Sequence, residues 1–158
     1  MVRSLLEYMG PLWSPWKIEL LEHIEKVQKR ATKMIDECKN FSYQDRLKFL
    51  NLPTLKYRRI RGDMILVFKY FMNVGKNSFY PNLILHEDSG TRGHNKKLKC
   101  IKFNTNLRKH FFTCRVVSIW NSLPCDLISQ NSVEKFEIGL DKYWEQADFR
   151  YNWRADLK

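Results

Sequence analysis

The sequence predicts a mainly α-helical fold. Apolar residues recur every three or four positions in four segments, which is the period of a helix face, and Ser, Thr, Asn or Pro residues stand near the ends of these segments. Strand-like alternation occurs in only one short stretch. The chain has 158 residues, 44% of them hydrophobic, so it can bury the core of one domain or of two small subdomains.

The clearest predicted helix covers residues 18–35. Its apolar stripe consists of Ile18, Leu21, Ile24, Val27, Ala31 and Met34. Glu22 precedes Lys26 by four positions, and Glu25 precedes Lys29 by the same spacing. We therefore expect two ion pairs along the helix surface, each contributing about 0.2–0.5 kcal/mol.

Two helices are expected next. Ser42 is a suitable N-cap for a helix over residues 43–50, Pro53 prevents its continuation, and Thr54 can cap a second helix over residues 55–72. The apolar face of the second helix consists of Tyr57, Ile60, Met64, Val67 and Phe71.

Residues 73–95 are rich in Gly, Asn, Pro and Asp, a loop-forming composition that marks a boundary. We therefore divide the chain into a helical subdomain at residues 1–75, a linker at residues 76–95 and a basic, mostly helical subdomain at residues 96–158. Residues 98–103 alternate imperfectly between apolar and polar side chains, so this second subdomain is predicted to contain one or two short strands.

A helix is predicted over residues 107–121. Thr105 or Asn106 can cap it, and Leu123-Pro124 closes it. Its apolar face consists of Phe112, Val116, Ile119 and Trp120.

The last predicted helix begins with a capping-box-like pair, Asn131 and Glu134, and extends to about Gln146. The side chains expected to point inward are Val133, Phe136, Leu140 and Tyr143. Residues beyond Ala147 show no pattern that predicts a structure.

Charge narrows the class of partner. The chain has 28 Lys and Arg residues against 17 Asp and Glu, a formal charge of +11, which favours phosphate-rich partners or an anionic membrane face. No apolar run approaches the roughly 18 residues of a membrane span, and a charge interrupts the N-terminal segment where a signal peptide is apolar. We expect a soluble, intracellular protein, nuclear or cytoplasmic, in which the four cysteines are free thiols.

Two groups of cations are candidates for nucleic-acid contact. The first is Lys56, Arg58, Arg59 and Arg61, which suits phosphate binding or, equally, a solvated helix face with Asp63 as a local partner. The second lies in residues 89–125, which contain no acidic residue. Its cations are Arg92, Lys96, Lys97, Lys99, Lys102, Arg108, Lys109 and Arg115.

The neighbouring aromatic residues leave two interpretations open. Phe111 and Phe112 could stack on bases, or they could belong to the core while the lysines keep the surface soluble.

The sequence does not predict catalysis, a metal or a cofactor. His94, Cys100, His110 and Cys114 have no recognised zinc spacing. The adjacent acidic pairs, at residues 36–37 and 87–88, point in different directions on any regular element. Phosphate-binding glycine loops, nucleophile elbows and His-Glu-x-x-His helices are also missing from the sequence.

A resemblance to a known family extends over roughly residues 2–145. The matching motifs, in chain order, are Leu6-Glu7-Tyr8, Pro11, Trp13-Ser14-Pro15, Leu21-Glu22, residues 25–33 (EKVQKRATK), Tyr43, Arg46-Leu47, residues 50–55 (LNLPTL), Arg58-Arg59, Gly62-Asp63, residues 91–94 (TRGH), Phe111-Phe112, Arg115-Val116-Val117 and residues 120–124 (WNSLP). Together they resemble the segment after the polymerase palm in non-LTR (LINE-type, jockey-like) retrotransposon reverse transcriptases, which are RNA-directed DNA polymerases.

The resemblance implies a helical, thumb-like bundle over residues 1–75, followed by a basic post-thumb region. It implies that the helix over residues 18–35 helps to grip a primer–template duplex, with Lys26, Lys29, Arg30 and Lys33 as its cations. The family's catalytic centre needs a pair of adjacent aspartates that this sequence lacks, so the chain is not expected to be an enzyme on its own. We expect a truncated copy whose palm would lie before Met1.

The expected function is non-catalytic binding of RNA, DNA or an RNA–DNA hybrid through the backbone, without sequence readout and without a membrane partner. The missing palm domain of the parent polymerase is a further candidate partner. The alternatives are a fragment that associates with itself or with another protein through its apolar helix faces, and a relic without function.

Overall fold

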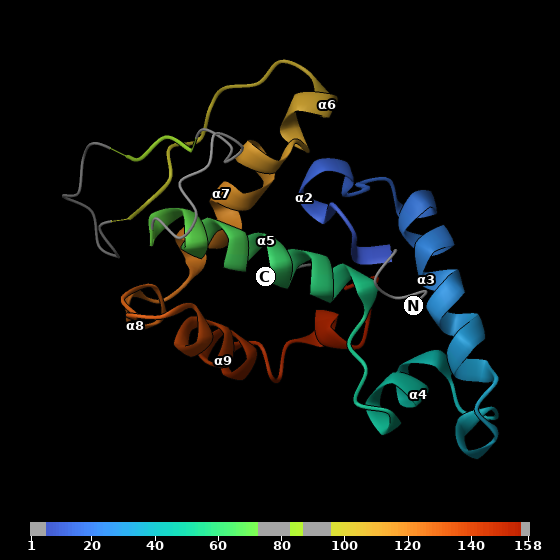
Figure 1. Cartoon of the computed structure of the whole chain (residues 1–158). Coiled ribbons are helices and arrows are strands. Elements are labelled where there is room, and N and C mark those ends of the chain that lie inside the picture. The colour runs from blue at the N-terminus through green and yellow to red at the C-terminus, as the bar shows by residue number, and fades with distance from the viewer. Residues whose placement is uncertain (1–5, 73–82, 87–95, 156–158) are drawn as a thin grey trace. The chain divides into compact units, whose positions relative to one another are not determined.

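The computed structural model describes residues 6–72, 83–86 and 96–155 (Figure 1). The chain divides into two compact units. Unit 1 comprises residues 1–61 and 144–158, and unit 2 comprises residues 62–143. The boundary between them falls within one helix.

Unit 1 consists of helices and short turns. Its elements are α2 (Gly10–Trp13), α3 (Ile18–Lys33), the 3-10 turn η1 (Asp36–Cys38), α4 (Tyr43–Phe49), the first part of α5 (Leu55–Phe71) and the 3-10 turn η2 (Asp148–Arg150). The helices predicted over residues 18–35, 43–50 and 55–72 are confirmed, with ends that differ by one or two residues. Figure 1 shows α3 in blue and α4 in teal, and these two helices are in contact.

Local capping explains why α4 and α5 are separate. Ser42 accepts a hydrogen bond from the backbone N–H of Asp45, as its N-cap position requires. At the other end, Asn51 adopts a left-handed conformation with φ 48°, and the N–H of Leu52 donates to the carbonyl of Leu47 at 2.9 Å. This is a Schellman motif, which satisfies the last carbonyls of a helix. Thr54 then caps α5, because its Oγ1 accepts from the N–H of Tyr57 at 3.1 Å.

The C-terminal tail, which no sequence pattern predicted, packs against the start of α5. Thr54 donates its N–H to the carbonyl of Arg150 at 2.9 Å and its hydroxyl to the carbonyl of Phe149 at 3.0 Å. The rings of Tyr57 and Phe149 lie 5.4 Å apart, and Trp144 contacts both. The first turn of α5 is therefore held by residues about ninety positions later in the chain.

Unit 2 is built around an aromatic core. Its elements are the remainder of α5, α6 (Asn106–Lys109), α7 (Phe112–Ser122), α8 (Cys125–Ile128) and α9 (Val133–Tyr143). Phe68 and Phe136 stack at 4.2 Å between ring centroids, and Phe71 and Trp120 stack at 5.3 Å. Gly139 allows α9 to approach α8, because a Cβ there would lie 3.3 Å from Leu127 Cδ1.

Several predictions for unit 2 are corrected. The single helix over residues 107–121 is two helices, α6 and α7, separated by His110 and Phe111. The cap of α9 is Ser132, whose Oγ accepts from the N–H of Lys135, and not Asn131. Tyr143, expected inward, is 52% exposed.

The predicted short strand is also wrong. Among the described residues only one isolated antiparallel bridge occurs, between Leu85 and Leu98. The N–H of Lys99 still donates to the carbonyl of Ile84 at 2.8 Å, but residues 100–103 pair with no strand in the described part of the chain.

The predicted linker, residues 76–95, lies mostly outside the described residues, so the division into subdomains on either side of it stays a prediction. None of the helices in the described part of the chain has the length and apolar composition needed to cross a bilayer.

Candidate nucleic-acid interface

Successive residues of helix α3 turn by about 100° around its axis, so residues three or four apart share a face. Three faces of different chemistry result. One face is buried and polar, since its two buried residues are Glu25 and Thr32. A second face carries cations and a third carries apolar side chains. The direction of the buried face decides which side chains the other two present to a partner.

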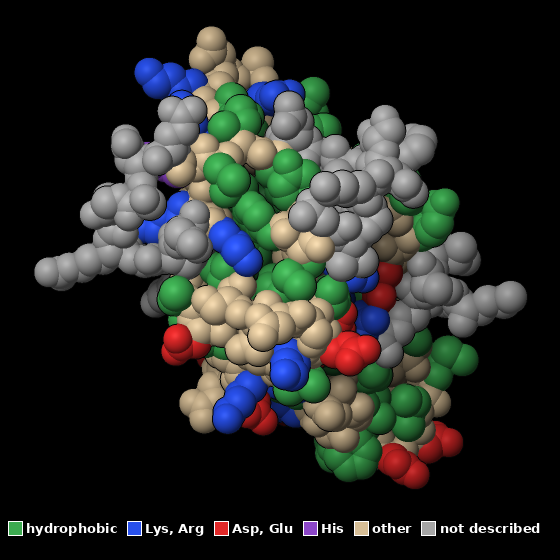
Figure 2. Space-filling view, turned by 60° about the vertical axis from the view of Figure 1, so that its left-hand side comes forward, with side chains coloured by type: hydrophobic (Ala, Val, Ile, Leu, Met, Phe, Trp, Pro, Cys, Tyr) green, Lys and Arg blue, Asp and Glu red, His purple; other side chains and the backbone are tan. Residues whose placement is uncertain are grey.

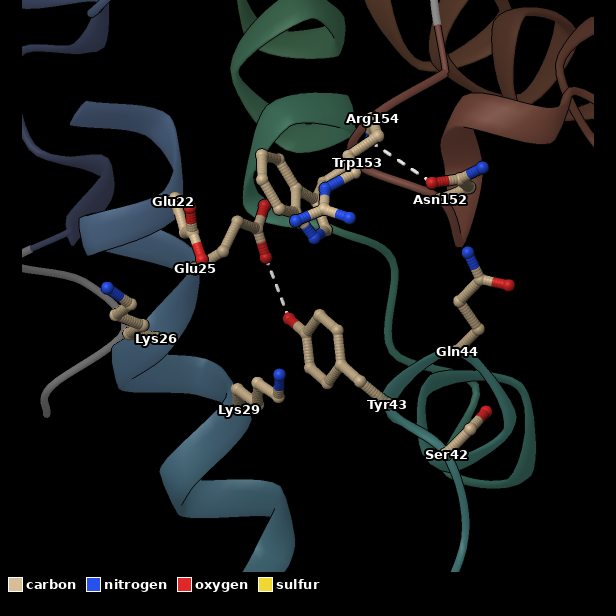
Figure 3. Close-up of a pocket in the computed structure, with 10 residues that line it drawn as sticks. All are labelled: Glu22, Glu25, Lys26, Lys29, Ser42, Tyr43, Gln44, Asn152, Trp153 and Arg154. Atoms are coloured by element: carbon tan, nitrogen blue, oxygen red, sulfur yellow. Dashed lines mark hydrogen bonds between the residues drawn. The ribbon is translucent and has the colours of Figure 1, made fainter. Parts of the chain in front are cut away.

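Glu25 joins three helices of unit 1. Glu25 is only 2% exposed, and its carboxylate accepts a hydrogen bond from each of the other two helices. The hydroxyl of Tyr43 on α4 donates to Oε2 at 2.7 Å (Figure 3). The N–H of Lys56 in the first turn of α5 donates to Oε1 at 3.0 Å. A carboxylate from another helix thus satisfies a backbone donor that the start of α5 leaves unpaired.

Burial raises the pKa of Glu25, because the charged form loses its hydration; the hydrogen bonds from Tyr43 and Lys56 and the nearby charge of Arg59 partly oppose this effect. Burial and the Glu25 charge raise the pKa of Tyr43, which stays protonated and donates. The ion pair predicted between Glu25 and Lys29 is therefore wrong. Glu22 and Lys26 do not form an ion pair either, within the part of the chain that the structure describes.

A second polar contact joins α3 to α4. Arg46, buried on α4, donates from Nε to Thr32 Oγ1 at 3.3 Å and from Nη1 to the carbonyl of Phe41 at 2.6 Å. Gln28 donates from Nε2 to the carbonyl of Pro53 at 3.1 Å. These bonds fix the rotation of α3 about its own axis.

The cationic face of α3 consists of Lys26, Lys29, Arg30 and Lys33, and all four are exposed. None of the four forms an ion pair with any residue that the structure describes. The seven-residue spacing from Lys26 to Lys33 corresponds to about 10 Å along the helix.

A cavity of about 270 Å³ lies beside this face, entirely within unit 1. Its lining residues are Glu22, Glu25, Lys26, Lys29, Ser42, Tyr43, Gln44, Asn152, Trp153 and Arg154. The guanidinium of Arg154 lies 4.9 Å from the centre of the Trp153 ring, and its backbone N–H donates to Asn152 Oδ1 at 3.1 Å. Figure 3 shows the α3 side chains on one side of the cavity and the tail residues on the other.

Sequence reasoning missed the tail half of this site. Trp153 and Arg154 lie in a segment without periodicity, and the only local signal is an aromatic residue followed by a cation. That signal is weak, because Arg beside Trp is common wherever a cation–π contact stabilises a surface.

The predicted cluster at residues 56–61 has partners inside unit 1. Lys56 Nζ donates to the carbonyl of Ala155 at 2.7 Å, and Arg58 forms a bidentate ion pair with Glu7, with Nη2 at 2.7 Å from Oε2. Arg59 is buried, and Arg61 is half-buried. Contact of these residues with nucleic acid stays a prediction.

The cations of the acid-free span fall into four groups. Arg92 lies outside the described residues, and Lys96 and Lys97 are half-buried. Arg115 forms a bidentate ion pair with Asp63, with Nε 2.9 Å from Oδ2 and Nη2 3.1 Å from Oδ1. Asp63, suggested as a local partner of the cluster at residues 56–61, thus pairs with Arg115. The exposed members are Lys99, Lys102, Arg108 and Lys109.

The two phenylalanines of this span differ. Phe112 is buried, which agrees with the core interpretation, whereas Phe111 is 45% exposed and Arg108 lies 5.6 Å from the centre of its ring. One of the two rings is therefore accessible for stacking.

The candidate metal ligands are not brought together in the described chain. Among its residues no group of three or more His, Cys, Asp or Glu side chains could hold a metal ion, and His94 lies outside it. All four cysteines are free thiols, with Cys38 and Cys114 buried.

Comparisons of the chain with protein-family models, with curated proteins and with solved structures find no match.

Proposed function

We propose that this chain binds the backbone of RNA, DNA or an RNA–DNA hybrid, without reading sequence and without carrying out chemistry of its own. The observation that carries the proposal is the cationic face of α3, whose four exposed cations have no acidic partner among the residues that the structure describes. Cations that a fold leaves unpaired are available to phosphates, and binding releases the counterions that phosphates hold.

The spacing of this face suits one nucleic-acid strand. About 10 Å along the helix corresponds to roughly three phosphates of a strand that rises 3.4 Å per nucleotide. Arg154, at the rim of the neighbouring cavity, adds a fifth cation within the same unit, and Trp153 adds an aromatic ring. Phosphate contacts of this kind hold a strand without specifying bases.

Unit 2 offers a second set of contacts. Lys99, Lys102, Arg108 and Lys109 are exposed, and Phe111 presents part of its ring to solvent. Stacking of a base on such a ring contributes about 1–3 kcal/mol in single-strand binding and is tolerant of sequence.

The resemblance to reverse-transcriptase thumbs supports the same assignment. In this proposal α3 is the helix that grips a primer–template duplex, and the polymerase chemistry belongs to a palm that would be a separate partner. The cationic face of α3 lies in the segment that carries the most specific part of the resemblance, residues 25–33.

A labelled RNA–DNA duplex of about 20 base pairs tests the proposal by fluorescence anisotropy. If about six phosphates are neutralised, the affinity falls about a thousandfold between 50 and 200 mM salt. Replacing Lys26, Lys29 and Lys33 by Gln should lower the slope of log affinity against log salt by about three, because each lysine–phosphate contact contributes about one. Two duplexes of unrelated sequence should give the same affinities.

The matched control replaces Lys48, Lys135 and Lys142 by Gln. It removes three exposed positive charges outside the cationic face and should leave the slope near that of the wild type. A salt-independent affinity contradicts the electrostatic mechanism, and equal effects of the two variants contradict the assignment to α3.

Replacing Arg58, Arg59 and Arg61 by Glu is a weaker test. Such a variant breaks the pair between Arg58 and Glu7 and places a second carboxylate near Glu25. Loss of binding would then not separate unfolding from a lost phosphate contact.

A further inference from the structure

The third face of α3 is an apolar strip that the described part of the chain leaves uncovered. It consists of Leu20, Ile24, Val27, Ala31 and Met34, of which Ile24 is half-buried and the other four are exposed. Met34 is 84% exposed and Leu20 is 49% exposed. On the face that Figure 2 brings forward, the left-hand side of Figure 1, apolar side chains likewise reach the surface beside Lys and Arg side chains.

The spacing of the strip is that of a helix–helix seam. Its residues follow one another at intervals of four, three, four and three, which is the heptad spacing of positions that meet a partner helix. The strip is narrow, because the polar face with Glu25 and Thr32 lies on one side and the cationic face on the other. A narrow seam fits one helix better than a membrane surface, which favours a broad apolar face.

The charges beside the apolar strip indicate which kind of helix can pack on it. The side chains bordering the exposed edge of the strip are His23 and Arg30, with Lys26 and Lys33 one row further away, and Glu19 is the acidic side chain on that side of α3. A second copy of this chain would bring the same cations against one another, which opposes pairing. A helix whose flanking positions carry Asp or Glu would instead meet opposite charges.

We propose that the apolar strip of α3 docks an amphipathic helix of another protein with acidic residues beside its seam. The strip supplies the buried contact, and the basic border selects the partner and sets its orientation. The strip itself contains no cation, but its basic border shares Arg30, Lys26 and Lys33 with the cationic face, so an acidic helix and a nucleic acid would compete for these three side chains.

Three fluorescent peptides of about 21 residues test the proposal with the full chain. The first carries Leu and Ile at heptad spacing with Glu at the flanking positions, the second has Lys in place of Glu, and the third has the composition of the first in scrambled order. We expect the first peptide to bind at least about tenfold more tightly than the other two, because only it offers both the seam and the charge.

A pair of variants locates the binding. Replacing Leu20, Val27 and Met34 by Gln should lower the affinity for the first peptide at least about tenfold and leave the affinity for the RNA–DNA duplex unchanged. The matched control replaces Leu107, Ile138 and Tyr143 by Gln, three exposed apolar side chains of unit 2, and should bind the peptide as the wild type does.

Four results would overturn the proposal. The scrambled acidic peptide could bind equally well, or the strip variant could keep its affinity for the first peptide. Light scattering could show a dimer that the strip variant loses, which would make a second copy the occupant. Binding to phosphatidylserine vesicles, lost in the strip variant and without peptide binding, would make the occupant a membrane.

Discussion

The two units hold their helices together by different chemistry. In unit 1, α3 contacts α4 and α5 through hydrogen bonds to buried Glu25 and Thr32. In unit 2, α5, α7 and α9 meet through aromatic rings: Phe68 stacks on Phe136, and Trp120 lies tilted against Phe136 at 6.1 Å between ring centroids. Helix α7 buries its apolar side chains, whereas α3 buries polar ones and exposes an apolar strip.

The difference has a functional consequence. Hydrogen-bonded contacts between helices are directional, so a network around Glu25 selects one rotation of α3 more sharply than apolar contact alone would. That rotation turns the cationic face and the apolar strip outward together. The core of unit 2 contributes burial, while the network of unit 1 determines which surfaces a partner meets.

The largest expected effect tests the buried network directly. Replacing Glu25 by Ala leaves the Tyr43 hydroxyl and the Lys56 N–H without their acceptor and removes the carboxylate near buried Arg59. We expect a loss of about 2–6 kcal/mol in the free energy of unfolding, measured by urea denaturation, because two donors lose their acceptor at a cost of about 1–3 kcal/mol each.

Glu22→Ala is the matched control, since Glu22 is the same residue type on the same helix, only half-buried and outside the network. It should change the free energy of unfolding by less than about 0.5 kcal/mol. Similar losses for the two variants would mean that α3 is not held through Glu25.

The next prediction compares the two units by a single type of substitution. Val116 on α7 is 0% exposed, whereas Val27 on α3 is 38% exposed. Val116→Ala should cost about 2 kcal/mol, since two buried methyl groups and a residual cavity contribute. Val27→Ala should cost less than about 0.5 kcal/mol.

Thermal and urea unfolding of the two valine variants measure this difference. If Val27→Ala proved as costly as Val116→Ala, the strip on α3 would be covered within the protein itself, and the docking proposal would lose its surface.

The sequence predicted the ends of α3, α4 and α5 to within one or two residues, because the signals are local. The caps Ser42 and Thr54 lie within a few residues of the backbone groups that they bind, and the apolar spacing repeats every three or four residues. The break at His110 and Phe111 was missed because no Gly or Pro stands there, and the helix pattern continues through it.

The site was harder to predict, since its contacts are distant in sequence. Nothing around Glu25 distinguishes it from Glu22, yet Glu25 is buried against α4 and α5 while Glu22 is half-buried. The cationic face of α3 was included among the predicted residues because of the resemblance. Arg58, Arg59 and Arg115 were included because of charge, although charge does not reveal the internal partners Glu7 and Asp63.

The smallest expected effect concerns pH. Burial raises the pKa of Glu25 above its ordinary value of 4.5, so the folded protein binds this proton more tightly than the unfolded chain does. Stability contributed by the protonated carboxyl is therefore fully present below pH 4.5 and declines as the pH rises through the folded-state pKa. Glu25→Gln keeps a side chain of the same shape and removes the titration, so its effect should be smaller than that of Glu25→Ala.

Urea denaturation of the wild type and of Glu25→Gln between about pH 4.5 and pH 7.5 measures the effect as a difference, which cancels the titration of other groups. We expect the wild type to lose stability relative to the variant as the pH rises over this range. Parallel stabilities would mean that Glu25 has the same pKa in both states, in which case desolvation at the junction of α3, α4 and α5 is fully offset by its hydrogen bonds. The opposite slope would mean that the charged carboxylate is favoured there, and the network of unit 1 would then gain stability from the charge of Glu25.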